Sequence, residues 1–145
     1  MKKQIIKTTA MMGLFLMMAI VSVQAQTMTR EVNIPFDFAA GNAQLKAGTY
    51  TIKQRSGNVL AISDAEGKMV ALVNAPLTIG SRDAKSGARL VFNQYDNQYF
   101  LSQVWLRVET GKQLFTTDAE SRTAREYKLA KGNAKPKRVE IAITR

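Results

Sequence analysis

The sequence contains no cysteine and no histidine. Without cysteine the chain forms no disulfide, so the folded protein must be stabilised by its hydrophobic core alone. The same absences exclude the Ser-His-Asp and Cys-His nucleophile arrangements and remove the two commonest side-chain ligands of zinc and copper. A general base with a pKa near neutrality is also missing, because histidine usually supplies it. We therefore expect a protein that is not an enzyme and that holds no cofactor and no metal.

Acidic residues are scarce as well, since 11 Asp and Glu stand against 21 Lys and Arg and give a net charge of +10. Such an excess attracts anionic partners, among them phospholipid headgroups, acidic polysaccharides and acidic proteins. Lys2, Lys3 and Lys7 carry three of the ten charges, so the chain after residue 25 carries +7. The charge therefore belongs mostly to the folded part of the protein.

The first 25 residues have the three-part pattern of a secretory signal peptide. A basic start precedes an apolar stretch over residues 10–23, which is shorter than the about 20 residues of a membrane span. Small residues at Val23 and Ala25 mark a cleavage site. We predict a signal peptide over residues 1–25 and a single exported domain over residues 26–145, periplasmic or extracellular. After cleavage no transmembrane span is expected, and export argues against a nucleic-acid partner.

After the predicted signal peptide, short apolar runs separated by turn residues recur about every ten residues, a spacing typical of a β-sandwich or barrel. In residues 31–38, alternation places Val32, Ile34 and both phenylalanines on one core-facing side. Pro35 has no N–H to donate, so this strand should lie at a sheet edge or carry a bulge. Further segments are expected as strands at 48–54, 59–63, 68–73 and 138–144, a connector at 39–47 and a polar loop at 81–87.

The clearest predicted hairpin joins two strands through a tight turn at Asp96-Asn97: residues 89–95 and 98–105. This register pairs Phe92 with Leu101. An uninterrupted ladder would place Trp105 on the face of Phe92 and Val104 on the opposite face. Because both faces are apolar, the hairpin is either covered on both sides or offers one side as a contact surface.

A helix is predicted over residues 118–131. Thr117 and Glu120 match the capping box, in which two residues three apart satisfy backbone donors at a helix start. Good helix formers follow, and Gly132 supplies the stop. The helix is weakly amphipathic, so we expect it on the domain surface with Tyr127 as its anchor. The predicted fold is mainly β, a single antiparallel sandwich or small barrel with one C-terminal α-helix.

The order of these segments resembles a family of small exported β-rich proteins found in soil bacteria such as acidobacteria. The matching segments are residues 32–38 (Val-Asn-Ile-Pro-Phe-Asp-Phe), 41–42 (Gly-Asn), 45–50 (Leu-Lys-Ala-Gly-Thr-Tyr) and 99–105 (Tyr-Phe-Leu-Ser-Gln-Val-Trp), with the helix at 117–131. The resemblance implies a Gram-negative envelope or extracellular setting. It carries over no activity, because the family has no established function.

Two acidic positions and a set of aromatic residues are candidate ligand sites. Asp37 is either a cation or sugar ligand or a polar residue that hydrogen-bonds the turn at Gly41-Asn42, and the second interpretation is favoured. The acidic turn at residues 64–67 lacks the regular spacing of a calcium loop and is interpreted as a plain turn. Aromatic rings stack on sugars and line ligand pockets, although core packing is the favoured role; the candidates are Tyr95, Tyr99 and Trp105.

The basic C-terminal segment is the most suggestive surface. Its seven cations are Arg122, Arg125, Lys128, Lys131, Lys135, Lys137 and Arg138, against one acid, Glu126, in the same stretch. Basic surface helices dock on anionic lipid or polymer. A solvated helix face is the favoured interpretation, because the opposite side of the helix lacks the large apolar residues that insert into bilayers.

From these features we expect an exported, non-enzymatic binding or structural module of the bacterial envelope. Its partners would be anionic envelope components or another envelope protein, contacted through the basic segment. The alternative is a binder of a small apolar ligand or carbohydrate that uses the aromatic hairpin and a pocket between hairpin and helix. An enzyme relying on carboxylates, Tyr or Lys ranks third.

Overall fold

The computed structural model describes residues 28–81 and 87–144. The predicted signal peptide at residues 1–25 lies outside the described residues, as does most of the polar loop predicted at 81–87. The described elements are β1 (Thr29–Ile34), β2 (Phe38–Ala40), β3 (Ala43–Leu45), β4 (Gly48–Ser56), β5 (Val59–Ser63), β6 (Met69–Asn74), β7 (Leu77–Gly80), β8 (Arg89–Tyr95), β9 (Gln98–Trp105), β10 (Thr110–Gln113), α2 (Asp118–Lys131) and β11 (Lys137–Ala142).

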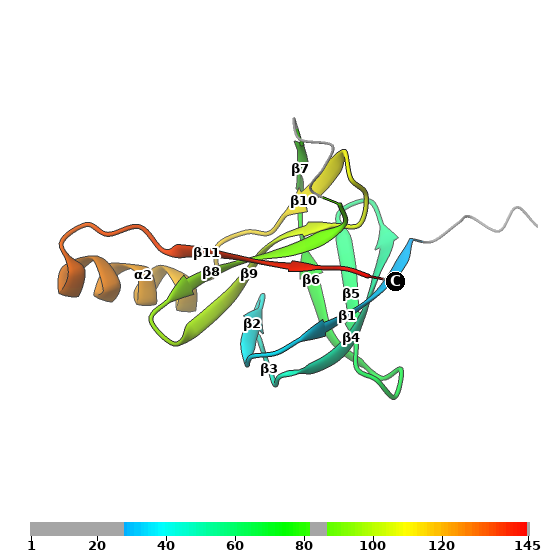
Figure 1. Ribbon diagram of the computed structural model, residues 1–145, viewed down its shortest axis with the longest axis horizontal. Coiled ribbons are helices and arrows are strands. Elements are labelled where there is room, and N and C mark those ends of the chain that lie inside the picture. The colour runs from blue at the N-terminus through cyan, green and yellow to red at the C-terminus, as the bar shows by residue number, and fades with distance from the viewer. Residues whose placement is uncertain (1–27, 82–86, 145) are drawn as a thin grey trace, which may run out of the picture.

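The strands form two sheets, with α2 at one end of the molecule (Figure 1). Sheet A has the order β1-β4-β5-β6 and is antiparallel throughout. Sheet B has the order β11-β8-β9-β10-β7, and β2 and β3 join it through a parallel pairing of Ala39 with Phe100. The predicted mainly β fold with a C-terminal helix is confirmed, and the β-sandwich is the architecture it fits. All other described strand pairings are antiparallel, and the single parallel pairing at β2 makes sheet B mixed.

Local sequence explains where several strands begin and end. β1 is an edge strand of sheet A, as Pro35 predicts. The single strand predicted over residues 31–38 is divided, because β1 ends at Ile34, directly before Pro35, and Phe38 begins β2 in sheet B. The predicted connector at residues 39–47 is instead the hairpin β2–β3, turned at Gly41-Asn42. Gly41 adopts a φ of +58°, a left-handed conformation that favours glycine. Two strands, β7 and β10, were not predicted. β10 has no apolar alternation, and in β7 the alternation is limited to Leu77 and Ile79, too short a run to mark a strand.

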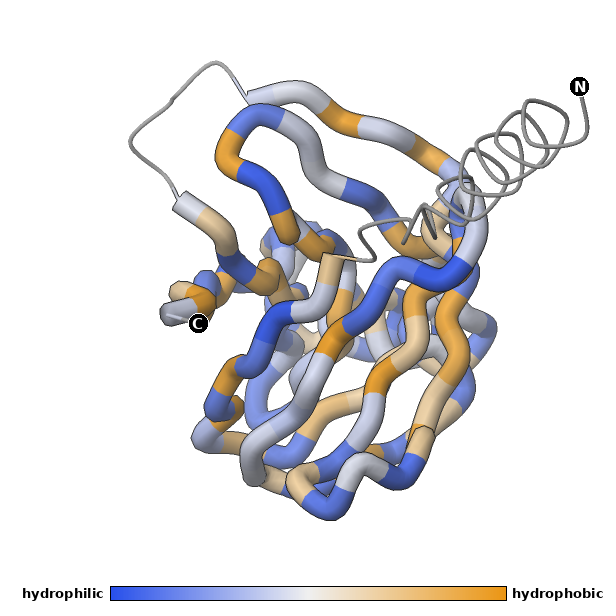
Figure 2. Tube along the Cα trace, turned by 90° about the vertical axis from the view of Figure 1, so that its right-hand side faces the viewer, coloured by the Kyte–Doolittle hydropathy of each residue, from blue (hydrophilic) through white to orange (hydrophobic). Residues whose placement is uncertain are grey.

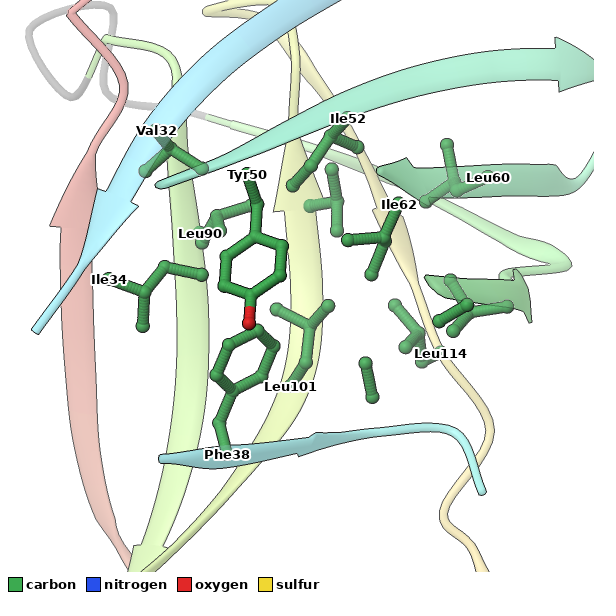
Figure 3. Close-up of a cluster of buried hydrophobic side chains, with 14 of the residues drawn as sticks. Val32, Ile34, Phe38, Tyr50, Ile52, Leu60, Ile62, Leu90, Leu101 and Leu114 are labelled. Atoms are coloured by element: carbon green, nitrogen blue, oxygen red, sulfur yellow. The ribbon is translucent and has the colours of Figure 1, made fainter. Parts of the chain in front are cut away.

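One hydrophobic core fills the space between the sheets (Figure 3). Sheet A contributes Val32, Ile52 and Ile62, and sheet B contributes Leu90 and Leu101, all of which are buried. Apolar and polar positions alternate along several strands (Figure 2), and β1 and β6 each turn one side inward, whereas β8 is buried on both sides. In a chain without cysteine, this core is the main source of stability.

The hairpin β8–β9 has the predicted register but not the predicted faces. Phe92 pairs with Leu101 as expected, and the register then shifts between Val91 and Phe92, so that one strand gains an extra residue. Such a bulge reverses the in–out alternation beyond it. Val104 consequently lies in the core, and Trp105 lies on the outer face of sheet B, the reverse of the prediction.

Candidate functional site

The basic surface consists of seven cations on α2, on the loop after it and on β11. All seven are exposed: Arg122, Arg125, Lys128, Lys131, Lys135, Lys137 and Arg138. Figure 1 shows α2 and the start of β11 together at the end of the molecule far from sheet A. The fold therefore gathers the cations of this segment at one end.

The helix begins and ends at the predicted residues. The Thr117 side chain accepts a hydrogen bond from the Glu120 N–H at 3.2 Å, so Thr117 is the N-cap. Gly132 ends the helix in the left-handed conformation, with its N–H donating to the Lys128 carbonyl. Both signals are local in sequence, and for that reason the bounds could be predicted.

A buried carboxylate attaches α2 to sheet B. Glu120 is only 5% exposed, and its Oε1 accepts hydrogen bonds from Asn93 Nδ2 at 2.8 Å and from the Tyr95 hydroxyl at 3.3 Å. Sequence analysis assigned Glu120 only to the capping box. Its two partners on β8, Asn93 and Tyr95, lie 27 and 25 positions away in the chain, and the sequence alone does not indicate these contacts.

Aromatic packing supplies the second attachment. The Tyr127 ring meets the Tyr95 ring edge-on at a centroid distance of 5.6 Å, and Tyr95 meets Phe100 in the same way at 5.8 Å. Burial, together with the nearby Glu120 carboxylate, raises the pKa of Tyr95 to about 12. Tyr127 is thus an anchor of the helix, as predicted, and with Glu120 it fixes which side of α2 faces solvent.

Two cations of the basic surface are partly neutralised. Lys131 Nζ forms an ion pair with Asp96, and Arg138 Nε pairs with Glu140 at 3.1 Å. The hydrogen bond to Asp96 raises the pKa of Lys131, and the Coulombic attraction acts in the same direction. For the other five cations, the described part of the chain provides no carboxylate at ion-pair distance. These five charges remain available to an external anion.

The outward side of α2 also carries a large apolar side chain. Leu129 is 86% exposed and stands one helical turn from Arg125 and two turns from Arg122. The sequence analysis considered only the side of the helix opposite to the cations, whereas Leu129 lies on the same side as Arg122 and Arg125. An exposed leucine among cations is the combination found on helices that lie at membrane interfaces.

The three candidate ligand aromatics pack against protein atoms. Tyr95 belongs to the cluster under α2, and Tyr99 stacks on Phe36 with the ring centroids 3.9 Å apart. Trp105 is 4% exposed, and the Arg89 guanidinium lies 4.3 Å from its ring centroid. A cleft of about 350 Å³ does separate the hairpin turn from α2, but polar side chains line most of it. These contacts favour a packing role for all three rings.

The two acidic residues considered as ligand sites accept hydrogen bonds from nearby residues. Asp37 accepts hydrogen bonds from Lys46 Nζ at 2.9 Å and from the Ala47 N–H at 2.8 Å, and these bonds lower its pKa. It therefore holds the turn before β4 rather than the predicted turn at Gly41-Asn42. Asp64 Oδ1 accepts from the Lys68 N–H at 2.8 Å within a plain turn. Among residues 28–81 and 87–144, no group of three or more acidic side chains is placed to hold a metal ion.

Gly111 packs directly against the buried Trp105 ring, and this contact yields a stability prediction. A Cβ added at Gly111 would lie 2.4 Å from Trp105 Cδ2, closer than the van der Waals distance, so the ring or the strand must move. Gly111→Ala is expected to lower the free energy of unfolding by about 1–3 kcal/mol, the usual cost of overpacking. Urea denaturation followed by fluorescence of Trp105, the only tryptophan, measures the change.

Gly80 provides the matched control, because it lies on β7 next to β10 and a Cβ there would meet nothing within 4 Å. Gly80→Ala should leave stability unchanged or raise it by up to about 1 kcal/mol, since alanine restricts the unfolded chain. Equal effects of the two substitutions would contradict the close contact at Gly111.

Comparison with known proteins gave no relative for this chain. A scan against protein-family models, a search of curated proteins and a search of solved structures each found no match. The resemblance to exported proteins of soil bacteria therefore stays a prediction. Over residues 28–81 and 87–144, the structure contains no helix with the length and hydropathy needed to cross a membrane.

Proposed function

We propose that the protein is an exported, non-enzymatic binding module of the bacterial envelope, and that its basic surface docks on anionic phospholipid. The observation that carries this proposal is the exposed surface of α2, where Leu129 lies one helical turn after Arg125 and two turns after Arg122, with the exposed Lys128 next to it in the chain. The cations supply attraction to phosphate, and the leucine favours a bilayer over a soluble polymer.

The expected free energy of binding to an anionic bilayer can be summed from the contributions of individual side chains. Each Lys or Arg near an anionic bilayer contributes about 1 kcal/mol, so the five cations outside ion pairs contribute about 5 kcal/mol. Insertion of Leu129 adds about 1.5–3 kcal/mol if its side chain leaves water completely. The sum corresponds to a Kd of about 1–20 μM before ordering costs. Salt should weaken such binding, because exposed charges are screened.

Co-sedimentation with vesicles tests the proposal. The protein starting at Gln26, which contains every described residue, should bind vesicles with anionic headgroups at low salt and not bind neutral vesicles. Replacing three cations, Arg122→Gln, Arg125→Gln and Lys128→Gln, should weaken binding by about 100-fold, since three charges are worth about 3 kcal/mol.

The matched control removes the same charge elsewhere, on the exposed cations Lys53, Arg55 and Lys68. Lys→Gln and Arg→Gln at these positions should change binding by less than about threefold if docking uses α2. The substitution Leu129→Ser distinguishes a lipid partner from a polymer partner. It should weaken binding to vesicles and leave binding to a soluble anionic polymer unchanged. Absent binding at low salt, or equal losses in the two triple variants, would overturn the proposal.

A further inference from the structure

A second site lies at the far end of the core from α2. A cleft of about 280 Å³ opens between the sheets, next to β7 and β10. Its apolar lining is continuous with the core, since Leu60 comes from sheet A, Val104 comes from β9 and both are buried. Leu106 and Met28 complete this lining. The floor of the cleft is thus the outer surface of the core, and Met28, which is half-buried, is the most accessible of its four apolar side chains.

Two cations stand among the lining residues of this cleft. Lys112 Nζ donates to Thr78 Oγ1 at 2.8 Å and to Asn58 Oδ1 at 3.4 Å, both neutral oxygens. Arg107 Nε donates to Met28 Sδ at 3.0 Å, and a thioether is a weak acceptor. Neither cation forms an ion pair with a carboxylate of residues 28–81 or 87–144. The lining therefore combines two positive charges with apolar side chains.

We propose that this cleft binds an amphiphilic anion, specifically a medium-chain alkyl carboxylate. The carboxylate would replace the thioether now offered to Arg107 and the neutral oxygens now offered to Lys112, and the alkyl chain would cover the apolar lining. A guanidinium gives a carboxylate two parallel hydrogen bonds, which fixes the orientation of the headgroup. The cleft, at about 280 Å³, falls just below the range for ligand pockets, about 300–1,000 Å³, so it suits a chain shorter than that of a membrane lipid.

The site is separate from the basic surface, and the two proposals fail independently. Docking of α2 on lipid needs the cations of residues 122–128, whereas the cleft needs Arg107 and Lys112. Monomeric carboxylate below its micelle concentration forms no bilayer, and paired substitutions in the cleft and on α2 show which of the two sets of cations binds it.

Isothermal titration of the protein starting at Gln26 with decanoate tests the proposal. Decanoate should bind, and octanoate should bind about tenfold or more weakly, since each methylene removed costs about fourfold in Kd. Decanol, which has the chain without the charge, and decyltrimethylammonium, which has the opposite charge, should bind at least tenfold more weakly than decanoate.

Removal of the two charges provides the residue-level test. Arg107→Gln with Lys112→Gln should weaken decanoate binding at least tenfold and abolish the preference over decanol. The matched control, Arg125→Gln with Lys128→Gln, removes two exposed cations of α2 and should leave decanoate binding unchanged. Circular dichroism confirms that both variants are folded. No binding of decanoate at millimolar concentration, equal affinity for decanol, or equal losses in the two double variants would overturn the proposal.

Discussion

Replacing Phe92 by alanine is expected to lower the free energy of unfolding by about 3–5 kcal/mol, the largest effect of a single side chain that we predict. Phe92 is completely buried, and its ring meets the Phe36 and Phe38 rings edge-on at centroid distances of 5.2 and 5.4 Å. Removing it takes away the transfer free energy of the ring and leaves a cavity that the rigid strands cannot close.

The loss is severe because domains of this kind are stable by only about 5–15 kcal/mol. No disulfide limits the unfolded chain, since cysteine is absent. Urea denaturation monitored by Trp105 fluorescence measures the change. Phe115→Ala is the matched control, because Phe115 is 61% exposed and its removal should alter stability by no more than about 0.5 kcal/mol. A small effect at Phe92 would contradict the central position assigned to its ring.

Replacing Glu120 by alanine is expected to lower the free energy of unfolding by about 2–3 kcal/mol and to loosen α2 from sheet B. The substitution leaves Asn93 Nδ2 and the Tyr95 hydroxyl without their common acceptor in a buried position. An unsatisfied buried donor costs about 1–3 kcal/mol, and hydrogen bonds to a charged partner lie at the upper end of that range. Helical circular dichroism and urea denaturation together measure both effects.

Glu120→Gln distinguishes the hydrogen bonds from the charge. Both donors use Oε1, and the glutamine carbonyl oxygen can accept the same two bonds, so this variant should lose less than about 1 kcal/mol. Glu126→Ala removes an exposed acid from the same helix and should be nearly neutral. If Glu120→Ala were as mild as Glu126→Ala, the carboxylate would not be what attaches the helix.

The features that the sequence predicted are those with local causes. The ends of α2 follow from Thr117 and Gly132, and the register of β8–β9 follows from the turn at Asp96-Asn97, where Asp96 adopts a φ of +52°. The bulge between Val91 and Phe92 has no local sequence signal of this kind. A single extra residue exchanged the sides of Val104 and Trp105, because side chains alternate with a period of two.

The candidate sites also contain some features with local causes, which could be predicted, and others that depend on tertiary contacts. Exposure of the basic surface could be anticipated, since a run of Lys and Arg is rarely buried. Leu129 lies on the outward side of α2 because the opposite side of the helix is attached to sheet B by Glu120. The bond from Asn93 to Glu120 is a tertiary contact, so local sequence does not predict it. The cleft could not be predicted, because Arg107 and Lys112 meet partners 79 and 54 residues away, at Met28 and Asn58.

The pairing of β11 with β8 has a consequence for the timing of folding. Residues 137–142 are synthesised after every other described strand and helix, yet they cover one whole edge of β8 and supply Glu140 to the buried Arg89 at 3.4 Å. Until they emerge, β8 presents open backbone donors and acceptors, which attract other chains. Sheet B is therefore completed only after residues 137–142 have been synthesised.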